Sequence, residues 1–364
     1  METPWGELGL LDLSDHELAA EILGADKHQL VEGLVVECLF DQIVAHVPAA
    51  SGRNVLALDV DSVVVDTRRE HERWLCFVWA RGMTAGLGRY LMALERCLVP
   101  YLVTYENGEF MATRVRAGRR ELAPRPLPEL MLELSGGRVS PFRVQGSVKN
   151  RNRQRQAFWG FISDYYQQRL GERVVLARLL INCAIQPYFR SVWNLDRVFV
   201  VDDDLWLFEI KHKFPMERNG LHFGINDGEL GMLDLLAGAG IRCLHTILVK
   251  PFWSKDVGSM YLLNDLHMRT QAAIIATVLD RAATARVMGR RSGRSGAHTS
   301  ITGATGLSFK SMAATDFRVL GRLSDAPSEV AAKLFGVMAG EASEGVRDTW
   351  LRSLASQRAD HGAG

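Results

Sequence analysis

Hydrophobic and polar positions follow two different periods in the first third of the chain. Residues 54–65 (NVLALDVDSVVV) and 73–80 (RWLCFVWA) are rich in valine, leucine and aromatic residues, as is typical of strands. Residues 101–116 form a further apolar stretch that Asn107-Gly108 interrupts, which predicts a hairpin. Residues 27–47 instead have the spacing of an amphipathic helix.

The second half of the chain alternates between the same two periods. Apolar spacing predicts, in order, a helix, two strands joined by an acidic turn, a helix, a strand and a further helix, over residues 154–170, 196–201, 205–213, 227–237, 242–249 and 262–283. Helices and strands mixed in this way predict an α/β protein.

Composition divides the chain into five segments. Prolines and glycines mark residues 121–150 as a connector between an α/β N-terminal domain of unassigned role, residues 1–120, and a second domain, residues 151–283. Residues 284–327 are rich in Gly, Ser and Arg and predict a flexible basic linker. Residues 328–364 are expected to form C-terminal helices.

Charge and cysteine content narrow the class of protein. The chain has 43 Lys and Arg against 42 Asp and Glu, so its overall charge favours no partner. No apolar run approaches the roughly 18 residues of a membrane-spanning helix, and the acidic start is unlike a secretory signal. The five scattered cysteines include no C-x-x-C pair, which favours reduced thiols and a cytoplasmic location.

The strand predicted over residues 205–213 carries charge in an apolar setting. Side chains alternate between faces along a strand, so Trp206, Phe208 and Ile210 are predicted to face a core. Glu209 and Lys211 then face the opposite way. A glutamate and a lysine inside an apolar strand are costly to bury without a partner or a use.

Asp196 begins the neighbouring strand, and pairing across the turn is predicted to bring it beside Glu209. Two carboxylates that converge on a sheet suit a hard divalent cation such as Mg²⁺. Such an ion orients a water and neutralises phosphate charge. Lys211 would hold the attacking water or offset the charge of the transition state.

Asp196 followed by Glu209-Ile210-Lys211 resembles the PD-(D/E)XK nuclease superfamily over roughly residues 154–251. The resemblance implies a restriction-endonuclease-like mixed sheet flanked by helices. It also implies Asp196, Glu209 and the Ile210 carbonyl as ligands of Mg²⁺ or Mn²⁺, and Lys211 as the catalytic lysine. Leu195 stands where the family has a proline.

Some members of that family add an acid from the first helix, for which Asp164 and Glu172 are the candidates. The family resemblance implies a nuclease that hydrolyses phosphodiester bonds of nucleic acid. An endonuclease of DNA in prokaryotic defence against foreign DNA is the expectation, while the sequence leaves open DNA or RNA and cleavage at ends or in the interior. A homo-oligomer or a partner protein stays open.

A basic run precedes the predicted helix over residues 154–170. Basic and amide side chains alternate there, as suits contacts with phosphates. The expected nucleic-acid-binding residues are Lys149, Arg151, Arg153, Arg155 and Lys213.

Two alternatives belong to other classes. Residues 58–67 (LDVDSVVVDT) resemble the first motif of haloacid dehalogenase phosphatases, which would make Asp59 the nucleophile and Asp61 the general acid. Ser62 stands in place of that family's glycine. The other alternative is a nuclease-fold protein that acts only as a binding or scaffold subunit.

Overall fold

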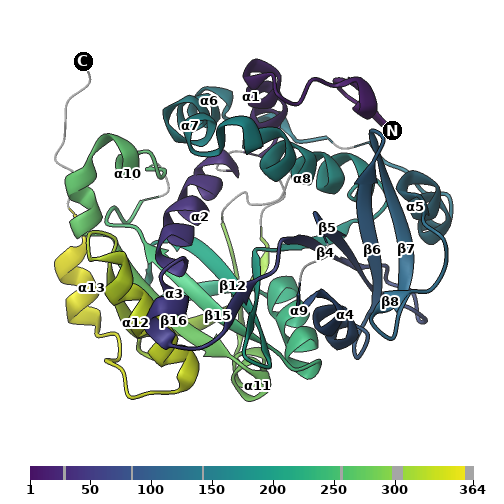
Figure 1. Ribbon diagram of the computed structural model, residues 1–364. Coiled ribbons are helices and arrows are strands. Elements are labelled where there is room, and N and C mark those ends of the chain that lie inside the picture. Colours follow the sequence, from purple (N-terminus) through teal and green to yellow (C-terminus); the bar gives the residue numbers. More distant parts are fainter. Residues whose placement is uncertain (28–29, 83–84, 142, 255–256, 297–305, 357–364) are drawn as a thin grey trace.

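A six-stranded mixed sheet lies at the centre of the molecule (Figure 1). The computed structural model describes residues 1–27, 30–82, 85–141, 143–254, 257–296 and 306–356. β12 and β15 of the central sheet are parallel, and its other neighbouring strands are antiparallel. Its strands, in spatial order, are β19 (Arg318–Arg322), β16 (Ala273–Leu279), β15 (Ile241–Val249), β12 (Asp204–Lys213), β11 (Arg197–Val201) and β3 (Val55–Ala57).

A second sheet continues from the edge of the first. Two chain segments pass between the sheets: β3 leads into β4, and β10 leads into β11 with Asp196 as the single residue between them. β4 lies between β10 and β5 in the second sheet. The strands of this sheet are β10 (Ser191–Leu195), β4 (Val60–Asp66), β5 (Trp74–Ala80), β6 (Val99–Glu106), β7 (Glu109–Arg116), β8 (Arg119–Arg120) and β9 (Arg125–Pro126).

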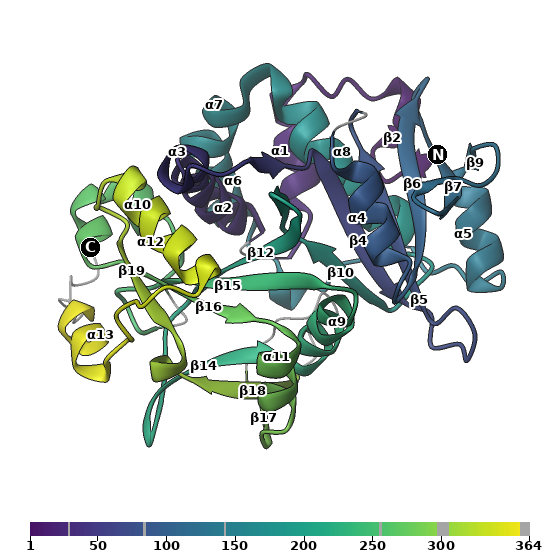
Figure 2. The same cartoon turned by 60° about the horizontal axis from the view of Figure 1, so that its bottom comes forward.

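Helices cover both faces of the central sheet because β12 is apolar on both sides. Trp206, Phe208 and Ile210 belong to the core that contains α2 (Leu30–Val44) and α12 (Pro327–Ala339). Leu205 and Leu207 belong to the opposite core, with α9 (Asp227–Gly238). Figure 2 shows a third sheet beyond that face, made of β13 (Met216–Arg218), β14 (Gly220–Asn226), β18 (Ser308–Ala313) and β17 (Ser292–Arg294).

The remaining helices surround these sheets. A long helical segment of α-, 3₁₀- and π-turns runs from Arg151 to Ile185, where the sequence predicts one helix over residues 154–170. Within it lie α6 (Arg151–Ala157), α7 (Ser163–Tyr166) and α8 (Leu176–Leu179). The other α-helices are α1 (His16–Gly24), α3 (Val47–Ser51), α4 (Leu87–Leu94), α5 (Leu127–Ser135), α10 (Tyr261–Asn264), α11 (Arg281–Met288) and α13 (Asp348–Leu354). Within the described ranges, none of the helices has the length and apolar character needed to cross a membrane.

The sequence predicts a separate N-terminal domain over residues 1–120, but the structure does not divide there. α2 packs on β12, and β3 pairs with β11, so the first part of the chain supplies elements of the central sheet and its cover. One apolar core accordingly includes residues of both predicted domains. Sequence separation hides this arrangement, because β3 and β11 are neighbours in space but lie about 140 residues apart in the chain.

Two further predictions are corrected. The single helix expected over residues 262–283 is divided: α10 and a 3₁₀ turn (Leu266–Thr270) come first, then β16, whose apolar run (AIIATVL) lies in the sheet, and then the start of α11. A short apolar run is ambiguous between strand and helix by period alone. The linker expected over residues 284–327 contains β17, β18 and β19, although its residues 297–305 lie outside the described part.

Candidate active site

The hairpin of β11 and β12 places Asp196 directly across from Glu209. Arg197 pairs with Phe208 in the antiparallel register, and the next position outward joins Asp196 and Glu209. Asp196 Oδ2 accepts a hydrogen bond from the Ile210 backbone N–H at 2.9 Å. Asp196 therefore lies beside Ile210 and near Glu209, at the point where the chain enters the sheet from β10.

The departure of the chain at Asp196 opens one edge of β12. Residues 197–201 of β11 pair with residues 204–208, whereas residues 209–213 pair with β15 on one side only, in the described part of the chain. Glu209 and Lys211 thus lie beside a strand edge that is unpaired in the described part of the chain.

Glu209 is a buried carboxylate with an incomplete set of partners. It is 2 % exposed, and its Oε1 accepts an ion-paired hydrogen bond from Lys211 Nζ. Its Oε2 is buried and has no hydrogen-bond partner among the described residues. Burial, followed by repulsion from Asp196, raises the pKa of Glu209 well above its ordinary value.

Lys211 lies between two carboxylates from different elements. Its Nζ is also 3.4 Å from Oε1 of Glu229, in the first turn of α9. Burial alone would lower the pKa of Lys211, but Glu209 and Glu229 raise it well above its ordinary value. Burial alone would raise the pKa of Glu229, yet Lys211 and Lys213 lower it to about 2. Lys211 and Glu229 are therefore held as an ion pair.

An acid from α2 approaches the same region. Glu37 lies 3.4 Å from the guanidinium of Arg197, which also binds Asp41 at 2.9 Å. Burial, then the nearby Asp196 carboxylate, raises the pKa of Glu37 to about 7. Glu37 is an acid near Asp196 that the sequence analysis did not single out; its signal is a glutamate inside the apolar run VVECLF.

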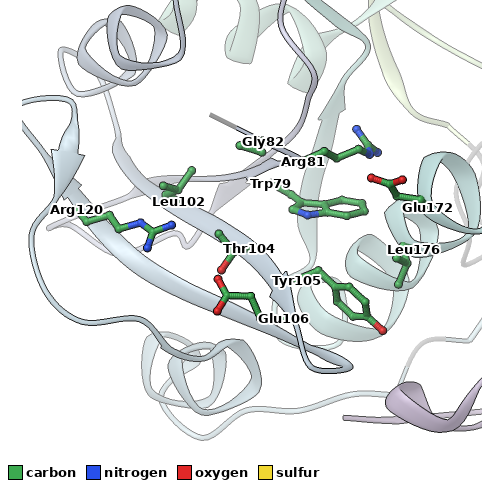
Figure 3. A pocket seen from close by; sticks show the side chains of 11 residues that line it. Trp79, Arg81, Gly82, Leu102, Thr104, Tyr105, Glu106, Arg120, Glu172 and Leu176 are labelled. Atoms are coloured by element: carbon green, nitrogen blue, oxygen red, sulfur yellow. The ribbon is translucent and has the colours of Figure 1, made fainter. Parts of the chain in front are cut away.

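Asp164 and Glu172, the acids that the family resemblance suggests for the site, lie elsewhere. Asp164 is exposed on α7. Glu172 lines a separate cavity of about 430 Å³ together with Trp79, Tyr105 and Arg120 (Figure 3). Neither joins Asp196 and Glu209, because the helical segment of residues 151–185 carries them on other faces.

His245 is a second residue that the sequence did not indicate. It lies on β15 opposite Glu209 and is 1 % exposed. Burial, then the charge of Lys213, lowers its pKa to about 3, so the ring is neutral. Its Nδ1 is buried without a hydrogen-bond partner among the described residues.

Of the predicted nucleic-acid-binding residues, three have partners within the protein and two have side chains without one in the described part. Lys213 donates a hydrogen bond to the Gly224 carbonyl at 2.6 Å, so its charge is directed inward. Arg153 forms an ion pair with buried Glu32, and Arg155 binds Glu17 at 3.0 Å. The side chains of Lys149 and Arg151 make no hydrogen bond or ion pair with the described residues, and Arg151 is exposed.

The donor set suits a metal ion only in part. In the described ranges, no group of three or more His, Cys, Asp or Glu side chains is arranged to hold an ion. Asp196 and Glu209 with the Ile210 carbonyl offer a smaller set of oxygens. Mg²⁺ is usually bound in this way, by one or two carboxylates together with water and substrate phosphates.

The carboxylates of the phosphatase-like motif are paired with arginines. Asp59 accepts hydrogen bonds from Arg81, at 3.1 Å, and from Arg173. Asp61 forms an ion pair with the same Arg81. A guanidinium that occupies a carboxylate lowers its nucleophilicity, so the geometry favours a structural role for both aspartates.

Comparisons with known proteins add no relative: no family model, curated protein or solved structure matches the chain.

Proposed function

We propose that the protein is a metal-dependent nuclease of the restriction-endonuclease-like type. The observation that carries this proposal is the buried Glu209 carboxylate, which has one oxygen without a partner in the described part and lies across from Asp196 and beside Lys211. An acid on each strand and a lysine two residues further along are the groups that phosphodiester hydrolysis requires.

The order of elements supports the same class. α2, β3, β11, β12, α9 and β15 give helix, three strands, helix and strand, with Asp196 at the start of the second strand and Glu209-Ile210-Lys211 on the third. In this interpretation the core begins at α2 rather than near residue 154. The second sheet and the long helical segment are then an insertion between the first and second core strands.

Asp196, Glu209 and the Ile210 carbonyl would hold the ion, Mg²⁺ or Mn²⁺. The fit rests on electrostatics: burial, followed by repulsion from Asp196, raises the pKa of Glu209, and a cation between the two carboxylates would relieve that repulsion. When bound, such an ion polarises a water and neutralises phosphate charge.

Lys211 would orient the attacking water and stabilise the charge of the transition state. Glu209 and Glu229 keep its ammonium protonated and fix its position between them. A charge that is held in place before the reaction stabilises a developing charge without reorganisation. Glu229 would act as a positioning residue, since it contacts the lysine.

The test is to incubate the purified protein with linear DNA, circular DNA and RNA in Mg²⁺, Mn²⁺ or EDTA. We expect cleavage that EDTA abolishes. Lys211→Ala should lower the rate by about 10²–10³ while both carboxylates keep the ion. Glu209→Ala should weaken Mn²⁺ binding as well, as measured by electron paramagnetic resonance.

Lys333→Ala, at an exposed position of α12, is the matched lysine control and should cleave normally. Cleavage at the normal rate by both site variants would refute the assigned roles. Metal-independent binding of nucleic acid without cleavage would favour the scaffold alternative. Hydrolysis of a phosphomonoester that Asp59→Asn abolishes would favour the phosphatase alternative.

A further inference from the structure

A second cavity lies beyond Arg197, on the side of the central sheet that α2 covers. Its volume is about 530 Å³, within the usual range of small-ligand cavities of about 300–1,000 Å³. Three aspartates, four arginines and two tyrosines contribute to its wall. This space suits one nucleotide and excludes a double helix.

Charged side chains connect the cavity to the candidate active site. Arg197 follows Asp196 directly and lines the cavity, while its guanidinium contacts both Glu37 and Asp41. Arg178, in α8, lies near enough to Glu37 to lower the pKa of that carboxyl. Glu209 and Lys211 face α9, so the cavity lies on the other face of the sheet, and Asp196 and Arg197, which are adjacent in the chain, connect the two sides.

One arginine of the wall is uncompensated. Arg81 and Arg173 bind Asp59, and Arg197 binds Asp41. Arg169 is exposed and makes no hydrogen bond or ion pair with the described part of the chain. The cavity thus presents a positive charge to an incoming anion such as a phosphate group.

The same wall offers aromatic surface. Tyr165 is half-buried and stacks on Phe161, with ring centroids 5.3 Å apart and planes at 19°. Tyr166 accepts a hydrogen bond from the Cys38 thiol at 3.4 Å, which holds its ring in the wall. Aromatic side chains beside a basic groove are the usual means of binding unpaired bases.

We propose that this cavity binds one unpaired nucleotide of the substrate strand. Arg169 contacts its phosphate, and Tyr165 stacks on its base. The proposal rests on the proposed nuclease function, and it makes single-stranded or locally unpaired nucleic acid the preferred substrate over a perfect duplex.

The test measures binding separately from cleavage. In the Lys211→Ala background with EDTA, fluorescence anisotropy compares a labelled single-stranded oligonucleotide with a duplex of the same length. We expect tighter binding of the single strand. Tyr165→Leu should weaken that binding by roughly tenfold, since each stacked base contributes about 1–3 kcal/mol, whereas Tyr165→Phe should retain it.

Arg169→Ala should also weaken single-strand binding, and its exposed position makes loss of folding an inadequate explanation. Arg286→Ala, an exposed arginine of α11, removes the same charge elsewhere and should leave binding unchanged. Normal binding by both Arg169→Ala and Tyr165→Leu would overturn the inference, even if the unmodified protein cleaves DNA. Dependence on both residues would sustain it, even if no cleavage is found.

Discussion

At the scale of single residues, the candidate site is defined by carboxylates that repel one another. Burial, followed by repulsion from Asp196, raises the pKa of Glu209 on β12 and of Glu37 on α2. Lys211 forms an ion pair with Glu209, and Arg197 forms one with Glu37. Neither cation removes the repulsion between these glutamates and Asp196. A site with excess negative charge is suited to a divalent cation and is costly in stability without one.

Glu37→Gln should change how stability depends on pH. The pKa of Glu37 is about 7 in the folded protein against 4.5 for the unperturbed side chain, so the folded state holds this proton more tightly. Stability from this group is therefore complete below about pH 4.5 and is lost as the pH rises through 7. Removing the carboxylate should make the variant more stable than the natural protein at pH 8, by up to about 3 kcal/mol, with little difference at pH 5.

The measurement is urea denaturation at both pH values, in EDTA. Glu329→Gln, at an exposed position of α12, is the matched control and should show no such difference. A Glu37→Gln protein that loses stability equally at both pH values would show that Glu37 acts as an ordinary ion-pair partner of Arg197.

Strand parity makes part of the site readable from sequence. The alternation along β12 and the acidic turn before it suffice to predict that Glu209 and Lys211 lie on the same side of the strand and that Asp196 lies near them. Glu37 and Glu229 could not be predicted in the same way. They reach the site from helices, and which helix covers which face depends on packing between segments far apart in the chain.

At the scale of elements, the β11–β12 hairpin positions the chemistry. Its turn contains Asp202 with φ = 53°, a left-handed conformation that favours glycine. The Asp202 backbone N–H donates to the Asn54 carbonyl at 2.9 Å, which ties the turn to the start of β3. The register that places Asp196 across from Glu209 follows from this turn.

Asp202→Val should destabilise the protein by about 1–2 kcal/mol, because a β-branched side chain strains a positive φ. Asp202→Gly should change stability by less than about 1 kcal/mol. Asp203→Val is the neighbouring control: its φ is not positive, and its surface pair with Arg89 contributes little. Urea denaturation midpoints distinguish the three, and equal values for Asp202→Val and Asp203→Val would contradict the argument.

The first helix of the core shows where element-level prediction ends. Apolar spacing predicts both the helix over residues 27–47 and the one near residue 154, and the chain forms helices in both places. The sequence order alone favoured the second as the partner of the strands. α2 takes that place because its valine and leucine side chains pack on β12 and α12, and such contacts have no signature in local periodicity.

At the scale of the whole molecule, a net charge of +1 means that affinity for nucleic acid must come from local groups. In the basic run of residues 149–155, only some of the positive charges are free to contact a ligand. Arg153 and Arg155 are paired with Glu32 and Glu17, so they stabilise the packing of α6 against α1 and α2. Lys149 and Arg151 are the members of the run with no ion pair in the described part.

The salt dependence of binding should therefore follow Lys149 and Arg151. Each phosphate neutralised adds about 0.9 to the magnitude of the slope of log affinity against log salt on duplex DNA, and about 0.7 on a single strand. Replacing both residues with alanine should lower the magnitude of the single-strand slope by about 1.4 and weaken all sequences alike. The double variant Arg281→Ala/Arg286→Ala, on α11, removes the same charge from a different surface and should leave the slope unchanged.

Anisotropy titrations over a salt series, in the Lys211→Ala background with EDTA, measure both slopes. If the protein with Lys149 and Arg151 intact and the double alanine variant have equal slopes, phosphates bind elsewhere. The arginines around the second cavity would then be the next surface to test.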